Sequence, residues 1–189
     1  MPLNIPIALT WFRIAVIPLF VALFYIPESL VSVPVRDAVA AWLFVVAAIT
    51  DWLDGWLARR WNQTSSFGAF LDPVADKLMV CAALLVLLHL DRVGSLIALV
   101  IIGREIAISA LREWMAKIGA SGSVAVHWLG KFKTAAQMIA IPCLLHYEDW
   151  LDMPVRLIGQ VLIVVAALLT VWSMFYYLKK AWPAIKEKA

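Results

Sequence analysis

Residues 51–77 read DWLDGWLARRWNQTSSFGAFLDPVADK, and they join two long apolar segments at residues 35–57 and 68–90. Four aspartates lie in this stretch, close to the point where one segment ends and the next begins. About 20 apolar residues form a helix long enough to cross a bilayer. Backbone polar groups in lipid must be satisfied within the segment itself, so both segments are predicted to be membrane-spanning helices that form an antiparallel hairpin.

The composition extends this interpretation to the whole chain. Of the 189 residues, 64% are hydrophobic and 15% are charged, whereas a soluble domain is about half apolar and about a quarter charged. A water-soluble fold of this length cannot bury so much apolar surface. Transmembrane helices are predicted at residues 7–26, 35–57, 68–90, 94–114, 124–146 and 154–178. We therefore expect an all-α polytopic membrane protein with six transmembrane helices and a single domain over residues 1–189.

Lysine and arginine residues are distributed unevenly between the predicted loops. One set of loops carries Arg36, Arg92 and Arg156. The other set, together with the C-terminal tail, carries Arg59, Arg60, Arg112, Lys117, Lys131, Lys133, Lys179, Lys180, Lys186 and Lys188. Because positively charged loops remain in the cytoplasm, both termini are predicted to be cytoplasmic. These basic residues form no stripe or motif typical of nucleic-acid binding, so no nucleic-acid partner is expected.

The four aspartates stand out because carboxylates are costly in lipid. A charge at the centre of a span costs about 2.5–3.5 kcal/mol on insertion scales. Asp51 and Asp54 are three residues apart and share one helix face, as do Asp72 and Asp76, which are four residues apart. In a hairpin, both pairs converge at the cytoplasmic end. Four converging carboxylates repel one another, and a hard divalent cation such as Mg²⁺ or Mn²⁺ removes that repulsion, so the sequence predicts a metal site that also meets substrate phosphates.

Small residues accompany the aspartates. Gly55 and Ala58 share a face with the first pair, and Gly68 lies one turn before the second. They leave room for a flat ligand to approach the backbone. Close helix packing through small residues is the alternative.

The full pattern is Asp51-x2-Asp54-Gly55-x2-Ala58-Arg59-x8-Gly68-x3-Asp72-x3-Asp76. It resembles the signature of the CDP-alcohol phosphotransferase family. That resemblance implies a six-helix membrane fold, usually a homodimer, with a polar cavity that faces the cytoplasm. It further implies that the first three aspartates are metal ligands and that Asp76 takes a proton from the acceptor hydroxyl and also contacts metal. The cytidine diphosphate would be bound by Asp54, Gly55, Ala58, Arg59 and Gly68.

A second resemblance covers most of the chain and is narrower. It is to the bacterial members of the family that make phosphatidylglycerophosphate. It implies that CDP-diacylglycerol is the donor and glycerol 3-phosphate the acceptor, in the bacterial inner (cytoplasmic) membrane. The matching stretches are Asn4-Ile5-Pro6, Thr10, Arg13, Arg104-Glu105, Leu111-Arg112-Glu113-Trp114 and Leu129-Gly130-Lys131-x-Lys133-Thr134.

An anionic acceptor needs cationic residues. Arg104 and Arg112 are eight residues apart, which places them on one helix face about 12 Å apart along the axis. With Lys131 and Lys133 they are the candidates for binding glycerol 3-phosphate, because guanidinium groups suit bidentate phosphate binding. The alternatives are an intramembrane ion pair for Arg104, with an aspartate or Glu105, and a role in topology for the other three.

Two residues of the first segment have a less specific assignment. Thr10 and Arg13 are candidates for contact with lipid phosphate, and Arg13 alternatively fixes topology by reaching the cytoplasmic surface.

Other functions remain open at this point. A membrane prenyltransferase also holds a diphosphate through aspartates and Mg²⁺, but its resemblance to this chain is weaker. A transporter or channel could use the aspartates as a cation pathway. Within the family, the acceptor could be another alcohol. Metal-dependent release of CMP would separate an enzyme from a transporter.

Overall fold

The computed structural model describes residues 5–61, 66–119, 128–149 and 152–188 of the chain. Within these ranges, all the long elements are α-helices and no strand is present. The helices are α1 (Ile5–Ala22), α2 (Val33–Arg60), α3 (Ser66–His89), α4 (Ser95–Lys117), α5 (Trp128–His146) and α6 (Val155–Lys188), with a short 3-10 helix η1 (Leu23–Tyr25) after α1. The prediction of an all-α fold is confirmed.

The helix boundaries differ from the predicted segments mainly at one position. The sixth helix was predicted to end at residue 178, but α6 continues to Lys188. The extension packs on α4 through Ala181, which is buried in a cluster with Tyr177, Ile108 and Met115. Tertiary contacts therefore lengthen this helix beyond its apolar segment. The start of the fifth predicted segment, residues 124–127, lies outside the described residues.

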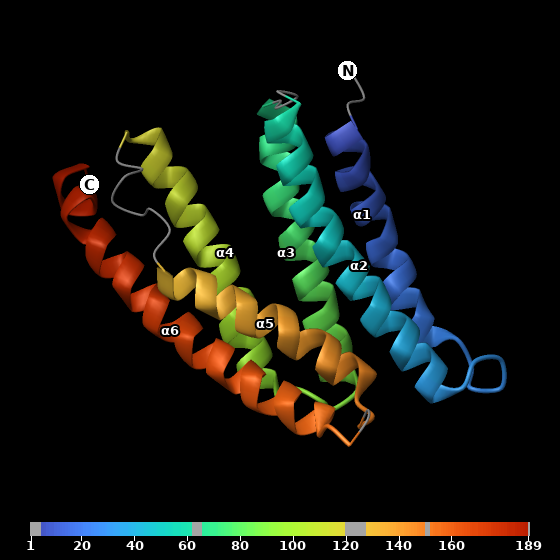
Figure 1. Cartoon of the computed structure of the whole chain (residues 1–189). Helices are drawn as coiled ribbons and strands as arrows, with labels where there is room; N and C mark the ends of the chain where they lie inside the picture. The colour runs from blue at the N-terminus through green and yellow to red at the C-terminus, as the bar shows by residue number, and fades with distance from the viewer. Residues whose placement is uncertain (1–4, 62–65, 120–127, 150–151, 189) are drawn as a thin grey trace.

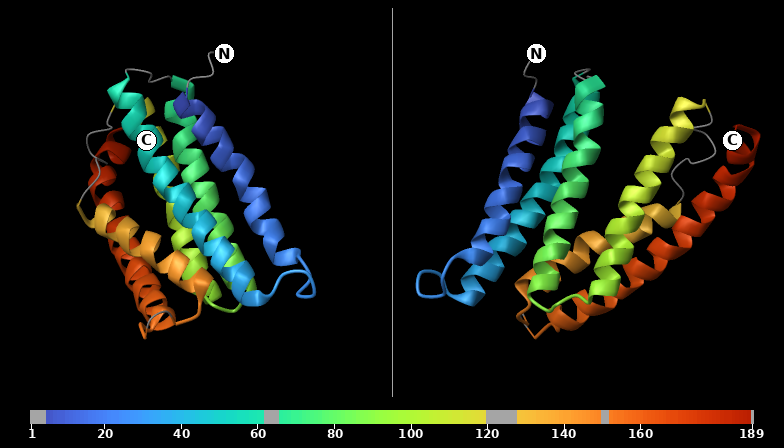
Figure 2. Two further views of the ribbon diagram at one scale, coloured as in Figure 1. Left: turned by 45° about the vertical axis from the view of Figure 1, so that its right-hand side comes forward. Right: turned by 180° about the vertical axis from the view of Figure 1, so that it is seen from behind.

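The six helices form an open arrangement that divides the molecule into two ends (Figure 1). The start of α1, the end of α2, the start of α3 and the ends of α4 and α6 lie at one end, which we call the site end. The connections at residues 26–32 and 90–94, and the start of α6, lie at the other, which we call the loop end. Helix α1 packs on α2 and α3, α4 packs on α6, and α5 makes its most extensive contacts with α6 and also contacts α2. Figure 2 shows that α1–α3 and α4–α6 spread apart toward the site end.

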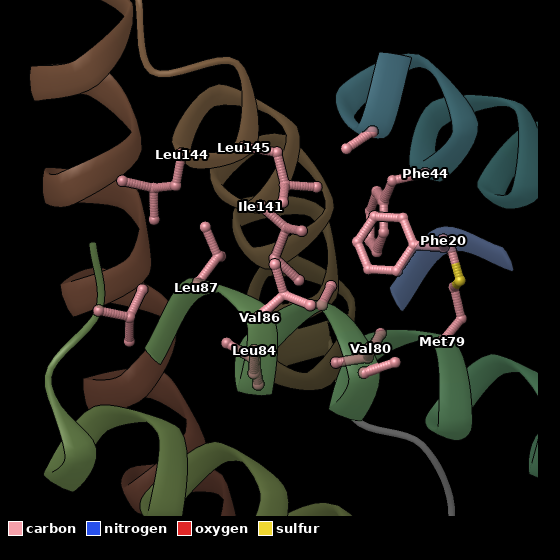
Figure 3. Close-up of a cluster of buried hydrophobic side chains, with 14 of the residues drawn as sticks. Phe20, Phe44, Met79, Val80, Leu84, Val86, Leu87, Ile141, Leu144 and Leu145 are labelled. Carbon is pink, nitrogen blue, oxygen red and sulfur yellow. The ribbon is translucent and has the colours of Figure 1, made fainter. Parts of the chain in front are cut away.

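A hydrophobic core holds the two groups of helices together. Phe20 of α1, Phe44 of α2, Leu84 of α3 and Ile141 of α5 are buried and lie toward one another (Figure 3). Helices α5 and α6 approach closely at Gly159, where an added Cβ would lie 2.8 Å from Cγ of Leu144. The core is therefore built largely from α1, α2, α3 and α5. It lies between the site end and the loop end.

The outer surface of the bundle suits a lipid environment. Three of the described helices are long and apolar enough to cross a membrane, at Ile7–Tyr25, Val33–Leu53 and Val155–Pro183. Large apolar side chains are exposed on the outside, as is expected of a lipid-facing surface; examples are Leu19, Trp42, Leu99, Leu168 and Trp172. Helices α3, α4 and α5 line the cavity described below. The chain is an all-α membrane protein.

The loop end contains a network of buried charges. Asp37 of α2 pairs with Arg92, in the connection between α3 and α4, and with Arg36 at 3.1 Å. Arg92 also donates to the carbonyls of Leu144 and Leu145, at 3.1 and 2.7 Å. Lone carbonyls at the end of a helix favour a cation, so Arg92 caps α5. This network ties four helices together where the chain turns.

Candidate active site

The first pair of contacts at the site end joins α1 to the aspartates. Thr10 Oγ1 donates a hydrogen bond of 2.6 Å to Oδ1 of Asp72 in α3. The guanidinium of Arg13, which is 2% exposed, pairs with Asp51 of α2. These contacts partly offset the repulsion between the carboxylates and fix their orientation. They also explain why α1, which carries none of the aspartates, packs on both α2 and α3.

Asp76 connects two cavities. It lines a narrow cavity together with Arg13 and Asp51, and the same side chain lines a larger cavity on its other side. Val80, one turn further along α3, and Met138 of α5 also line both cavities and form the apolar boundary between them. Asp76 is thus the one aspartate among the described side chains that reaches both spaces.

The larger cavity has a volume of about 300 Å³ and lies between α3, α4 and α5. Its lining carries four cationic and two anionic side chains, a formal net charge of +2. The charged residues are Asp76, Lys77, Arg104, Glu105, Arg112 and Lys133. Such a concave site with convergent charges suits a small anionic ligand.

Arg104 and Arg112 both line this cavity, and both pack against the same aromatic ring. The two guanidinium groups lie 5.6 and 5.2 Å from the ring centroid of Tyr177 in α6. Arg104 also donates to Ser173 Oγ at 3.2 Å and lies 3.4 Å from Oε1 of Glu105. The ion pair with Glu105 and the cavity position therefore coexist, although the sequence offered them as alternatives for Arg104.

Glu105 is a residue that the sequence-based reasoning did not place in the site. Its carboxylate pairs with Lys133 of α5, and Lys133 is buried. Glu105 therefore bridges two cations from two helices. The signal in the sequence was the adjacent Arg104-Glu105 pair inside an apolar segment, where a carboxylate needs a partner. Its connection to Lys133 depends on how α4 meets α5.

Several polar atoms around the larger cavity have no partner among the described residues. They are Nε of Arg104, Nε of Arg112 and Oε1 of Gln137. Buried polar groups normally find a hydrogen-bond partner, and each unsatisfied group costs about 1–3 kcal/mol. All three atoms belong to side chains that line one cavity, which makes this cavity the candidate site for a polar ligand. Gln137, like Tyr177 and Ser173, was not singled out from the sequence.

The remaining predicted residues are only partly located. Helix α2 includes Asp54, Gly55, Ala58 and Arg59, and helix α5 includes Lys131, but their side chains lie outside the described part of the structure. Gly68 is buried at the third residue of α3.

The carboxylates suit a hard divalent cation by their chemistry. Within the described residues there is no group of three or more histidine, cysteine, aspartate or glutamate side chains that could hold a metal ion. The side chain of Asp54, which completes the predicted set, is not described. Asp51 and Asp76 line one cavity, so two of the four predicted ligands are brought together. The assignment of the metal ligands stays a prediction.

Comparison with known proteins identifies the class. Residues 3–172 match the CDP-alcohol phosphatidyltransferase family. The chain therefore belongs to this family of transferases, as its aspartate signature predicted, and divalent-metal dependence is general in the family.

Several bacterial relatives carry the name CDP-diacylglycerol–glycerol-3-phosphate 3-phosphatidyltransferase. The protein from Yersinia enterocolitica is 53% identical over 189 residues, covering 99% of this chain and 100% of the relative. The protein from Pectobacterium atrosepticum is 52% identical over 183 residues, covering 96% of each. The protein from Haemophilus influenzae is 48% identical over 185 residues, covering 96% of this chain and 95% of the relative. The similarity thus extends over nearly the full length of the chains.

Proposed function

We propose that this enzyme transfers the phosphatidyl group of CDP-diacylglycerol to glycerol 3-phosphate, which gives phosphatidylglycerophosphate and CMP. The observation that carries the proposal is the position of Asp76 between two cavities, one shared with Asp51 and one lined by cations. The names of the full-length relatives support the same donor and acceptor. A role as a cation-coupled transporter is disfavoured by membership of a transferase family.

The donor side of the site is assigned to the aspartates. Asp51, Asp54, Asp72 and Asp76 would hold Mg²⁺ or Mn²⁺, which when bound neutralises the diphosphate and polarises the phosphorus under attack. Arg13 and Thr10 hold two of these carboxylates in place, and this orienting role replaces the lipid-phosphate contact as our preferred assignment for them. The cytidine diphosphate would lie against Asp54, Gly55, Ala58, Arg59 and Gly68.

The acceptor side is the larger cavity. A phosphate monoester carries a charge of about −1.5 to −2 at pH 7, which matches the formal charge of +2 on the cavity lining. Arg104 and Arg112 present guanidinium groups that suit bidentate phosphate binding. Lys133 adds a cation that Glu105 positions, and Lys131 is assigned to the same site.

The chemical step uses Asp76 as the general base. The oxygen of the acceptor's 1-hydroxyl forms a bond to the phosphorus attached to diacylglycerol, and the bond from that phosphorus to the oxygen of CMP breaks. The hydroxyl proton passes to Asp76, and CMP leaves with the electron pair of the broken bond. Asp76 lines both the cationic cavity assigned to the acceptor and the narrow cavity that contains Asp51, so it can take the proton of an acceptor hydroxyl close to the aspartates assigned to the donor.

The setting of the enzyme is proposed from its relatives and its charges. We place it in the bacterial inner membrane because its relatives are bacterial proteins. We place both termini and the site end in the cytoplasm because most loop lysines and arginines occur at that end. A homodimer, as the family resemblance implies, and a single domain over residues 1–189 complete the proposal.

Transfer of radiolabel from glycerol 3-phosphate into lipid tests the function. The assay uses the purified full chain, CDP-diacylglycerol and Mg²⁺ or Mn²⁺, with added chelator and the Asp76→Asn variant as controls. We expect metal-dependent transfer that is lost in both controls. Release of CMP only with another alcohol would refute the assignment of glycerol 3-phosphate as the acceptor. Folded protein that neither transfers label nor releases CMP with any acceptor would refute the enzyme assignment.

A further inference from the structure

Gln137 is a buried polar side chain for which the mechanism above has no use. It lies on α5, its side chain is 4% exposed, and it lines the larger cavity. Its Oε1 has no hydrogen-bond partner among the described residues. An amide oxygen in this position is costly unless a ligand donates a hydrogen bond to it.

The position of Gln137 along α5 relates it to the phosphate-binding group. It follows Lys133 by four residues, so both side chains lie on the same helix face, about 6 Å apart along the axis. The next residue, Met138, lines both cavities. Gln137 therefore lies one turn from the proposed phosphate site, toward the boundary that Asp76 shares.

The other polar groups of the cavity are already engaged or differ in chemistry. The carboxylate of Glu105 accepts hydrogen bonds from Arg104 and Lys133. Thr134 Oγ1 donates to the carbonyl of Gly130 at 2.9 Å. The arginines and lysines can only donate hydrogen bonds. Asp76 is assigned to the attacking hydroxyl. This leaves Gln137 as the neutral group that can accept a hydrogen bond from a second hydroxyl.

We infer that Gln137 binds the secondary hydroxyl of the acceptor and makes the enzyme selective for a polyol phosphate over a phosphate with a single hydroxyl. This inference rests on the proposed function. A hydroxyl both donates and accepts, so it complements the amide of Gln137. The contact fixes the rotation of the acceptor between its phosphate and its 1-hydroxyl, which presents that hydroxyl to Asp76. Gln137 is therefore a specificity-determining residue.

The test compares two acceptors, glycerol 3-phosphate and 3-hydroxypropyl phosphate, which lacks only the secondary hydroxyl. With the wild-type chain we expect kcat/KM to be at least about tenfold higher for glycerol 3-phosphate, since the analogue leaves a buried acceptor unpaired. In Gln137→Leu we expect the ratio to fall to within about threefold of unity. The matched control is Gln160→Leu, a glutamine on α6 that does not line the cavity, which should keep the wild-type ratio.

The outcomes separate this inference from the proposed function. Equal kcat/KM for the two acceptors in the wild-type chain would overturn the inference even if Gln137→Leu fails to fold. A preference for glycerol 3-phosphate that persists in Gln137→Leu would overturn the inference too, because another residue must then bind the secondary hydroxyl. In both cases the proposed function stands. Transfer to neither acceptor by the wild-type chain would refute the proposed function and this inference with it.

Discussion

Both ends of the molecule place two arginines against a tyrosine, but the other contacts of these arginines differ. At the loop end, Arg92 and Arg156 lie 4.3 and 4.7 Å from the ring centroid of Tyr147. At the site end, Arg104 and Arg112 lie against Tyr177 in the same manner. Each end therefore stacks two arginines on one tyrosine.

The difference lies in the remaining partners. Arg92 has a carboxylate and two carbonyls, as well as the ring. Arg104 also has Glu105, Ser173 and the ring as partners, but Arg104 and Arg112 each keep an Nε without a partner among the described residues. Buried charge is costly unless it is paired and bonded. The comparison teaches that the loop-end network stabilises the fold, whereas the site-end cations are preorganised to bind an anionic ligand.

The largest effect is expected from Asp76→Asn, which keeps the size of the side chain but removes the base. Transfer should fall about 1,000-fold, within the range for loss of a general base. The thermal stability should not fall, because Asp76 has no ion pair with the residues that the structure describes. Stopped assays with the purified variant measure the rate, and calorimetry or near-UV circular dichroism checks folding. A loss of less than about tenfold would remove Asp76 from the role of base.

The next effect should be on stability alone. Asp37→Asn leaves Arg92 buried without its carboxylate, which should destabilise the fold by about 3 kcal/mol and lower the Tm by about 6–12 °C for a chain of this size. The KM for glycerol 3-phosphate should not change at a temperature where the variant is folded. A raised KM with an unchanged Tm in Asp37→Asn would contradict this assignment, because the loop end would then bind the acceptor and not stabilise the fold.

The cavity arginines should show the opposite pattern. Arg104→Ala and Arg112→Ala should each lower kcat/KM for glycerol 3-phosphate about 10- to 100-fold, mainly through KM, since each removes charged hydrogen bonds to phosphate. Arg156→Ala is the matched control, because it also removes an arginine from a tyrosine ring but lies at the loop end. Acceptor kinetics that are unchanged in both cavity variants would contradict the phosphate assignment.

A smaller effect is expected at the contact between α1 and α3. Thr10→Val removes the hydrogen bond to Asp72 with little change in volume, and should reduce the rate about three- to tenfold, as loss of one hydrogen bond does. The reduction should be accompanied by a weaker apparent affinity for Mg²⁺ or Mn²⁺, because the carboxylate is less well oriented. Metal titrations of activity measure this, and identical titration curves would show that Thr10 does not orient the site.

Much of the fold was predictable because its signals are local. The length of the apolar segments predicts the helices. The spacing of Asp51 from Asp54, and of Asp72 from Asp76, predicts that each pair shares a helix face. The segregation of Arg36, Arg92 and Arg156 to one end also follows from the order of loops.

The missing parts of the site depend on tertiary contacts. Tyr177 contacts two arginines only because α6 packs on α4, which lies more than 60 positions away in the sequence. Glu105 meets Lys133 across 28 positions of sequence. The sequence also offered only a metal as relief for the crowded carboxylates, whereas α1 supplies Thr10 and Arg13 as further partners. Side-chain spacing within one helix carries no information about such partners.

A crystal structure of the full chain with glycerol 3-phosphate and CDP tests the central claim most directly. These two ligands cannot react with each other to give a phospholipid, so the acceptor stays bound. We expect its phosphate in the larger cavity, within hydrogen-bond distance of Arg104 and Arg112, with the 1-hydroxyl beside Asp76. A phosphate bound instead among Arg36, Arg92 and Arg156 at the loop end, or an empty cavity at saturating ligand, would contradict the account.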